Sequence, residues 1–136
     1  EAAQAREQLV KLGARGVTLE SLPETVQGVV LSRLAQQTQQ QQFTLKVASV
    51  VGREFGYRIV RDVHPLEVDR AHVREHCDAL ARASLLASLR GDPEPAYAFR
   101  HSVIQDTAYS LLAFAQRRQL HRAIAEWQEA RGAVGP

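Results

Sequence analysis

Residues 85–100, LLASLRGDPEPAYAFR, decide how the rest of the sequence is interpreted. Two short strand-like runs, 85–90 and 96–100, flank GDPEP, whose glycine and prolines are typical of a turn. This arrangement predicts a β-hairpin. Because the segments on both sides have helical periodicity instead, we expect one hairpin set among helices.

Five helical segments are expected before the hairpin: residues 1–12, 21–34, 38–51, 55–64 and 67–83. Ser21 with Glu24, and Thr38 with Gln41, have the spacing of a capping box, in which two residues satisfy each other's free amides. A glycine at position 52 marks the end of the third segment. These start and stop signals define a mainly helical chain.

Apolar spacing indicates how the first of these helices pack. In the segment 21–34, helical spacing is shown by Val26, Val29, Val30 and Leu34. The segment 38–51 is apolar on two sides, with Phe43, Val47, Val50 and Val51 on one and Leu45 and Ala48 on the other. A helix that is apolar on two sides is usually central. We therefore expect this helix at the middle of the domain.

Two more helices are expected after the hairpin, at 101–114 and 116–130. Leu120, Ile124 and Trp127 lie on one face of the second. A helical pair of this kind buries its face by stacking on neighbours, which predicts that a longer helical array follows.

The order of elements predicts a mainly α fold in which three helices and a β-hairpin form a winged-helix domain. Two further helices then begin a superhelical, tetratricopeptide-like array. The expected domain boundaries give an N-terminal helix or linker from a preceding domain at 1–17, the winged-helix domain at 18–100, a helical extension at 101–131 and a linker or frayed end at 132–136. Whether the helix 1–12 belongs to this domain stays open.

Composition narrows the class of protein. The chain has 136 residues, 45% of them apolar, which suits one domain with a real core. No apolar run reaches the length of a membrane span, and the start lacks the basic and apolar pattern of a secretory signal. The one cysteine, Cys77, fits a reducing compartment. We therefore expect a cytoplasmic protein with no membrane partner.

Two absences bear on function. The sequence contains no methionine, so we expect a segment of a longer protein. The P-loop pattern G-x-x-x-x-G-K-[ST] does not occur, and neither Lys11 nor Lys46 follows a glycine-rich stretch. We therefore expect that this chain hydrolyses no nucleotide by that machinery.

Candidate reactive and metal-binding residues have simpler structural explanations. Cys77 shares a helix face with two apolar residues, which favours core packing over nucleophilic chemistry. His72 and His76 have the i, i+4 spacing of metal ligands, but no third ligand stands out, so a solvated helix face is favoured. Ser102 lies beside His101 without an evident acid. We expect no metal, no catalytic residues and no enzyme activity in this segment.

Helix 67–83 would occupy the DNA-reading position of a winged helix. It carries three arginines and four acidic residues, which leaves it with a net charge of −1. Recognition helices normally carry a positive excess, because phosphate contacts dominate the affinity for DNA. The composition argues against nucleic acid as a partner.

Arginines concentrate after the hairpin. The segment 100–131 holds five arginines against three acidic residues, with Arg117, Arg118 and Arg122 in its densest part. A charge run of this kind is typical of a solvated helix face. The alternative is a surface for an acidic partner or for another domain of the same chain.

His101 lies where the hairpin ends and the next helix begins. The first amides of a helix are unpaired and its dipole favours anions, so an imidazole at this point suits a phosphate oxygen. The alternative is that His101 caps the helix or packs at the base of the hairpin. The residues alone leave both interpretations open.

Four blocks, in order, resemble one known family: SLPETVQGVVLSRL (21–34), TLKVASVVGREF (44–55), YAFRHSVIQDTAYSLL (97–112) and RRQLHRAIAEWQE (117–129). They resemble the segment that follows the P-loop ATPase domain in STAND-type signal-transduction ATPases. The resemblance covers the chain from about residue 18 onward. It is greatest to the large bacterial proteins that join a class III adenylyl or guanylyl cyclase to such an ATPase, relatives of soluble adenylyl cyclase.

The resemblance implies a non-catalytic regulatory module. In that family this segment is a winged-helix domain that packs against the nucleotide-binding domain and helps to hold its ADP-bound state. His101 takes the position of a histidine near the β-phosphate of ADP, and Arg100 is a second candidate contact. Ser102 stands where the immune-receptor version of the motif has an aspartate, so this sequence departs from that version.

The resemblance also implies cofactors and partners. ADP or ATP with magnesium would belong to the parent protein, and the fragment alone would bind none. The partners would be the upstream P-loop ATPase domain and the downstream helical repeats. The alternatives are a DNA-binding winged-helix domain of a transcription regulator and a nucleotide-independent protein-interaction scaffold.

Overall fold

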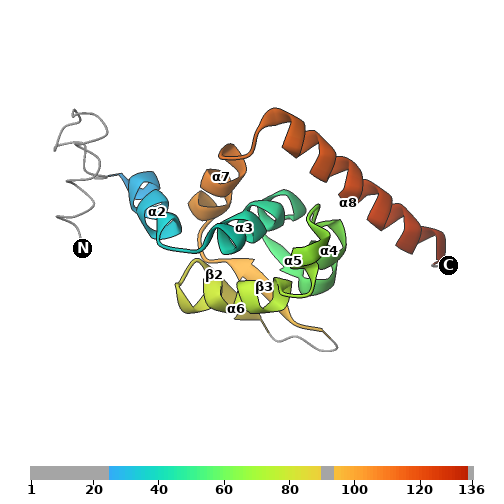
Figure 1. The fold of residues 1–136 in the computed structure, drawn as a ribbon, viewed down its shortest axis with the longest axis horizontal. Coiled ribbons are helices and arrows are strands. Elements are labelled where there is room, and N and C mark those ends of the chain that lie inside the picture. Colours follow the sequence, from blue (N-terminus) through green and yellow to red (C-terminus); the bar gives the residue numbers. More distant parts are fainter. Residues whose placement is uncertain (1–24, 90–93, 135–136) are drawn as a thin grey trace. The chain divides into compact units, whose positions relative to one another are not determined.

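A computed structural model describes residues 25–89 and 94–134 of the chain (Figure 1). This part is mainly helical, with a small antiparallel sheet. The chain divides into two compact units, Glu1–Gln36 and Gln37–Pro136. The expected helix 1–12 and the expected boundary at residue 17 lie outside the described residues.

The described part of the first unit contains helix α2 (Val26–Ala35). Its N-cap is Thr25, whose side-chain oxygen accepts a hydrogen bond from the Gly28 amide at 3.0 Å. The described helix therefore begins at Val26, and the expected capping box of Ser21 and Glu24 lies outside the described residues. Of the expected apolar stripe, Val30 and Leu34 are buried.

Helix α3 (Gln39–Val51) is the central helix of the second unit, as predicted. Its capping box is confirmed: Thr38 Oγ1 accepts from the Gln41 amide at 3.0 Å, and Gln41 Oε1 accepts from the Thr38 amide at 3.2 Å. Both apolar sides are used, since Leu45 and Val47 are fully buried. Gly52 ends the helix with a φ of +153°, which L-residues rarely adopt.

The predicted hairpin is confirmed as β2 (Leu86–Leu89) and β3 (Ala96–Phe99). A third strand, β1 (Glu54–Gly56), was missed because three residues are too few for an alternating pattern. It pairs antiparallel with β3, so the order in the sheet is β1-β3-β2. The central strand β3 contributes two buried aromatic residues, Tyr97 and Phe99.

The expected helix at 55–64 is present as α4 (Tyr57–Val63). It begins two residues later than predicted because Phe55 and Gly56 belong to β1. It ends at His64, whose extended conformation (φ −62°, ψ 125°) is the one favoured before a proline.

The prediction of one continuous helix at 67–83 is wrong. The segment forms α5 (Glu67–Arg70) and α6 (Val73–Arg82), separated by a turn. The His72 amide donates to the Asp69 carbonyl at 3.0 Å, a three-residue turn that replaces the helical bond. The predicted face of α6 is nevertheless confirmed, since its apolar residues, Val73, Cys77 and Leu80, are fully buried.

The two expected C-terminal helices are α7 (Ser102–Ser110) and α8 (Phe114–Val134). Both belong to the second compact unit: α7 packs on α3, and α8 packs on α3 and α4. Leu120 and Ile124 of α8 are buried, as predicted. Helix α8 continues to Val134, beyond the expected end of the extension at residue 131.

Candidate functional site

His101 is the N-cap residue of α7 and follows β3 after one intervening residue. Its backbone is extended (φ −141°, ψ 150°), and its carbonyl accepts from the Ile104 amide at 3.0 Å. The imidazole makes no capping hydrogen bond to α7 and is exposed to solvent. The helix is therefore begun by the backbone of His101, which leaves its ring available.

The amides of Ser102 and Val103 precede the first intrahelical hydrogen bond of α7, where a helix carries partial positive charge. The first turn contains no acidic residue. Arg100, the residue before His101, adds an exposed cationic side chain, and its amide donates to the Leu85 carbonyl at 3.2 Å. The arrangement has the chemistry of an anion site at the base of the hairpin.

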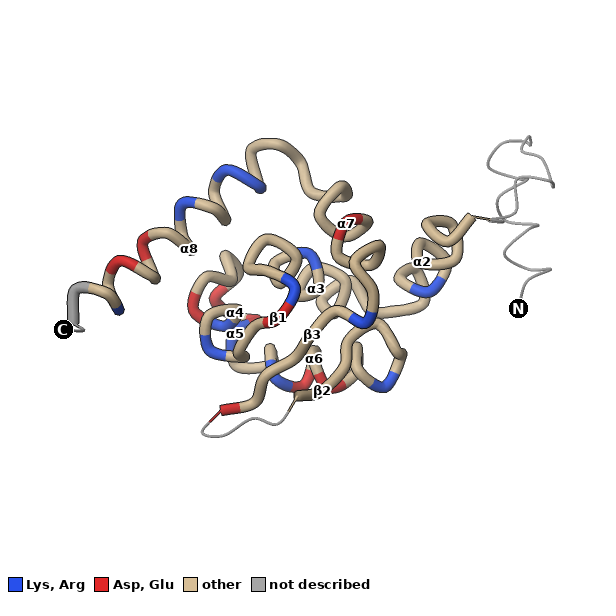
Figure 2. Tube along the Cα trace, turned by 180° about the vertical axis from the view of Figure 1, so that it is seen from behind, with Lys and Arg blue, Asp and Glu red and all other residues tan. Residues whose placement is uncertain are grey.

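The three arginines predicted as a partner surface differ in their surroundings. Arg117 is half-buried, with its guanidinium 4.6 Å from the ring centre of Tyr109, and it donates to the Ser110 carbonyl at 3.3 Å. Arg117 therefore connects the start of α8 to the end of α7. Arg118 and Arg122 are exposed. Figure 2 shows the basic residues along the first half of α8 and acidic residues farther along it.

His72 and His76, which have metal-ligand spacing, contact different residues. His76 Nδ1 lies 2.8 Å from Thr44 Oγ1, whereas His72 Nδ1 lies 3.1 Å from Glu75 Oε1. Among the described residues, no group of three or more His, Cys, Asp or Glu side chains is placed to hold a metal ion. Burial raises the pKa of the Cys77 thiol to about 12, so at neutral pH it is an inert part of the core.

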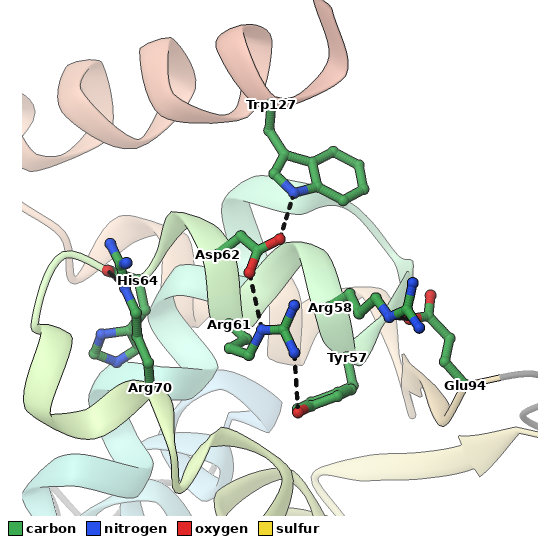
Figure 3. Close-up of polar contacts among 8 residues, drawn as sticks. All are labelled: Tyr57, Arg58, Arg61, Asp62, His64, Arg70, Glu94 and Trp127. Carbon is green, nitrogen blue, oxygen red and sulfur yellow. Dashed lines mark hydrogen bonds and ion pairs between the residues drawn. The ribbon is translucent and has the colours of Figure 1, made fainter. Parts of the chain in front are cut away.

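A polar cluster between α4 and α8 was missed by sequence analysis (Figure 3). Trp127 Nε1 donates to Asp62 Oδ2 at 2.8 Å, and Arg61 Nε donates to Asp62 Oδ1 at 2.8 Å. Burial raises the pKa of Asp62, but the hydrogen bonds from Arg61 and Trp127 outweigh it and lower the pKa below its usual value of 3.8. The carboxylate thus connects the two helices.

The same cluster extends toward the sheet. Arg61 Nη1 donates to the Tyr57 hydroxyl at 3.4 Å, and its guanidinium lies 5.3 Å from the centre of the Tyr57 ring. Arg58 forms an ion pair with Glu94, just before β3, at 3.2 Å. This pair is partly exposed and contributes little to stability by itself. Together the contacts fix α4 between α8 and the hairpin (Figure 3).

None of the helices in the described ranges, 25–89 and 94–134, has both the length and the apolar content needed to span a bilayer. The chain matches no protein-family model. It is 29% identical over 79 residues to an uncharacterized protein of Rhizobium meliloti (strain 1021). The aligned region is 58% of this chain and 8% of that protein, so the similarity concerns a small part of a much longer relative.

Proposed function

We propose that this chain is a winged-helix regulatory module of a STAND-type signalling protein. In this proposal it couples the ADP or ATP state of an upstream nucleotide-binding domain to downstream modules. The order α3, β1, α4, α6, β2, β3, with β1 paired to β3, supports the winged-helix assignment. The helices α7 and α8 would then begin the helical array.

The exposed imidazole of His101 at the start of α7 is the observation that carries the proposal. A phosphate of ADP held by the upstream domain would accept hydrogen bonds from the first amides of α7 and from this imidazole. Arg100, the preceding residue, is exposed and would add positive charge. The residues present fit such a group, because no acidic side chain lies in the first turn of the helix.

In this proposal, regulation results from a contact with the ADP phosphate that exists only while ADP is bound. While ADP is bound, its phosphate would fix the hairpin and α7 against the nucleotide-binding domain. Loss of ADP would remove that contact, and the module would be free to rotate. Hydrolysis, magnesium and any adenylyl or guanylyl cyclase output would belong to other domains of a cytoplasmic parent protein.

The exposure of Arg118 and Arg122 favours a second candidate, a scaffold that captures an acidic partner through α8 without nucleotide. Charge reversal of both residues would abolish such capture. DNA reading is less well supported, because Asp78 on α6 accepts a 2.6 Å hydrogen bond from Tyr97 and adds negative charge beside the sheet.

The test uses a longer version of the chain that includes the upstream ATPase domain expected by this proposal. The wild type, His101→Ala and a control, His72→Ala, are purified, and the ADP that each carries is quantified. Stoichiometric ADP in the wild type and control, with a clear loss in His101→Ala, supports the proposal. Equal ADP in all three would reduce His101 to a helix start, and no ADP in any would favour the scaffold.

A further inference from the structure

Two histidines that the proposed function does not use lie in the corner formed by α3, α5 and α6. His64 is fully buried and meets the ring of Phe43 edge-on, with ring centres 5.2 Å apart. Its Nδ1 accepts a hydrogen bond from the Leu66 amide at 3.1 Å, so the proton of the neutral ring is on Nε2. Among the described residues, Nε2 has no hydrogen-bond partner.

The second histidine, His76, connects α6 to α3. Its Nδ1 lies 2.8 Å from the hydroxyl of Thr44, which is itself fully buried. Thr44 is one residue from Phe43, which contacts His64. The two imidazoles therefore support the same segment of α3 from the two ends of the α5–α6 corner.

Several charged groups face this pair. Burial is the largest influence on both rings and lowers the pKa of each below 6.5. Asp69 on α5 opposes this effect at both rings, and Glu75 on α6 opposes it at His76. Positive charge acts in the other direction: Arg70 and a protonated His76 disfavour charge on His64, and His72 disfavours charge on His76. Neutral rings are favoured in the folded corner.

We propose that His64 and His76 form a proton-operated hinge that holds α6 against α3 when both rings are neutral and releases it locally in mildly acidic solution. Protonation places a donor on His64 Nδ1, so the hydrogen bond from the Leu66 amide is lost. It also leaves a charged ring in a fully buried position without an acceptor for Nε2. The inference does not depend on the proposed function.

The direction of the pH effect follows from linkage. Because the folded corner binds protons less readily than the open one, the stability held by the neutral rings is fully present above pH 6.5. It is lost as the pH falls below that value, until the rings also titrate in the folded state. The opening equilibrium rises by at most about tenfold per pH unit for one histidine and about a hundredfold for two.

The chain contains a separate reporter for each side of this hinge. Cys77, its one cysteine, lies fully buried on α6 and becomes reactive when α6 separates from α3. Trp127, its one tryptophan, lies on α8 and is bonded to α4. Local opening would change the reactivity of Cys77 and leave the fluorescence of Trp127 unchanged.

The experiment follows the reaction of Cys77 with 4,4′-dithiodipyridine from pH 7.5 to 5.5, with each rate divided by that of free cysteine at the same pH. We expect the normalised rate to rise more than fivefold below pH 6.5 while Trp127 emission stays constant. The variant His64→Asn/His76→Asn should give a flat profile, because an amide side chain can still form hydrogen bonds at both positions but does not titrate. His121→Asn, which removes an exposed histidine on α8 away from this corner, should keep the wild-type profile.

A flat wild-type profile, an unchanged response in the double variant, or a parallel change in Trp127 emission would each overturn the hinge. NMR titration of the histidine rings in the wild type tests the same proposal without the double variant, in case that variant does not fold. His64 and His76 should stay neutral to a pH below 6.5. Ordinary titration of both near pH 6.5 would also overturn the proposal.

Discussion

Trp127 on α8 donates a hydrogen bond from Nε1 to Asp62 Oδ2 on α4 at 2.8 Å, across 65 positions of the sequence. In the preceding turns of the same helix, the side chains of Leu120 and Ile124 are buried. The bond therefore extends the attachment of α8 beyond its apolar contacts, and Arg61 holds the other oxygen of the same carboxylate (Figure 3). Motion of the α3–α4 core would be transmitted to this part of α8.

We expect a measurable coupling between Asp62 and Trp127. A double-mutant cycle with Asp62→Ala and Trp127→Phe should give an interaction free energy of about 1 kcal/mol, the value typical of a hydrogen bond in a partly exposed position. Urea unfolding followed by far-UV circular dichroism is the measurement, because Trp127→Phe removes the one tryptophan. Glu126→Ala, at an exposed position of α8, serves as the control in place of Asp62→Ala. A coupling near zero for the first pair would mean that apolar packing alone holds α8.

Two glycines should respond to alanine with opposite signs. Gly52 has φ +153° and ψ −178°, a region almost reserved for glycine, so Gly52→Ala should lower the free energy of unfolding by about 1–3 kcal/mol. Gly132 is exposed in α8, and a Cβ there would meet nothing within 4 Å. Gly132→Ala should therefore raise stability, by up to about 1 kcal/mol. Thermal unfolding of both variants tests the pair; the same sign for both would contradict this conformational argument.

The sequence was informative where structure is determined locally. The capping box at Thr38, the stop at Gly52 and the hairpin after Leu85 depend on residues a few positions apart, and each is present. The prediction of one continuous helix at 67–83 failed because it also relied on local periodicity alone. The break after Arg70 leaves Val68 exposed and Val73 buried, a difference that periodicity alone does not reveal.

Long-range relationships were beyond sequence analysis. Strand β1 exists because Phe55 pairs with Tyr97, 42 positions later by their numbering (97 − 55). Nothing in the sequence around Asp62 indicated its hydrogen bond with Trp127, which depends on how α8 packs on α4. At the candidate site, the helix start at His101 was predictable from the hairpin and the helical pattern, whereas the half-buried position of Arg117 depends on how α7 and α8 meet.

The capping box of α3 gives a third prediction. Thr38→Ala removes the side-chain acceptor of the Gln41 amide and should lower the free energy of unfolding by about 1 kcal/mol. Gln40→Ala, an exposed position on the same helix, should change it by less than about 0.5 kcal/mol. Chemical denaturation of both variants makes the comparison. Equal effects would mean that the cap does not stabilise the start of α3.

The last prediction concerns acid. Because the pKa of Asp62 in the folded protein lies below 3.8, its contribution to stability is fully present above that pH and is lost as the pH falls through the folded-state value. Asp62→Asn removes this titration but keeps an oxygen that can accept from Trp127. The stability advantage of the wild type over this variant should therefore shrink between pH 5 and pH 2.5 in urea unfolding followed by Trp127 fluorescence. Both proteins contain the same histidines, so the effect of the histidines cancels in the comparison. An advantage that does not change with pH would show that the hydrogen bonds from Arg61 and Trp127 do not favour the ionised carboxylate.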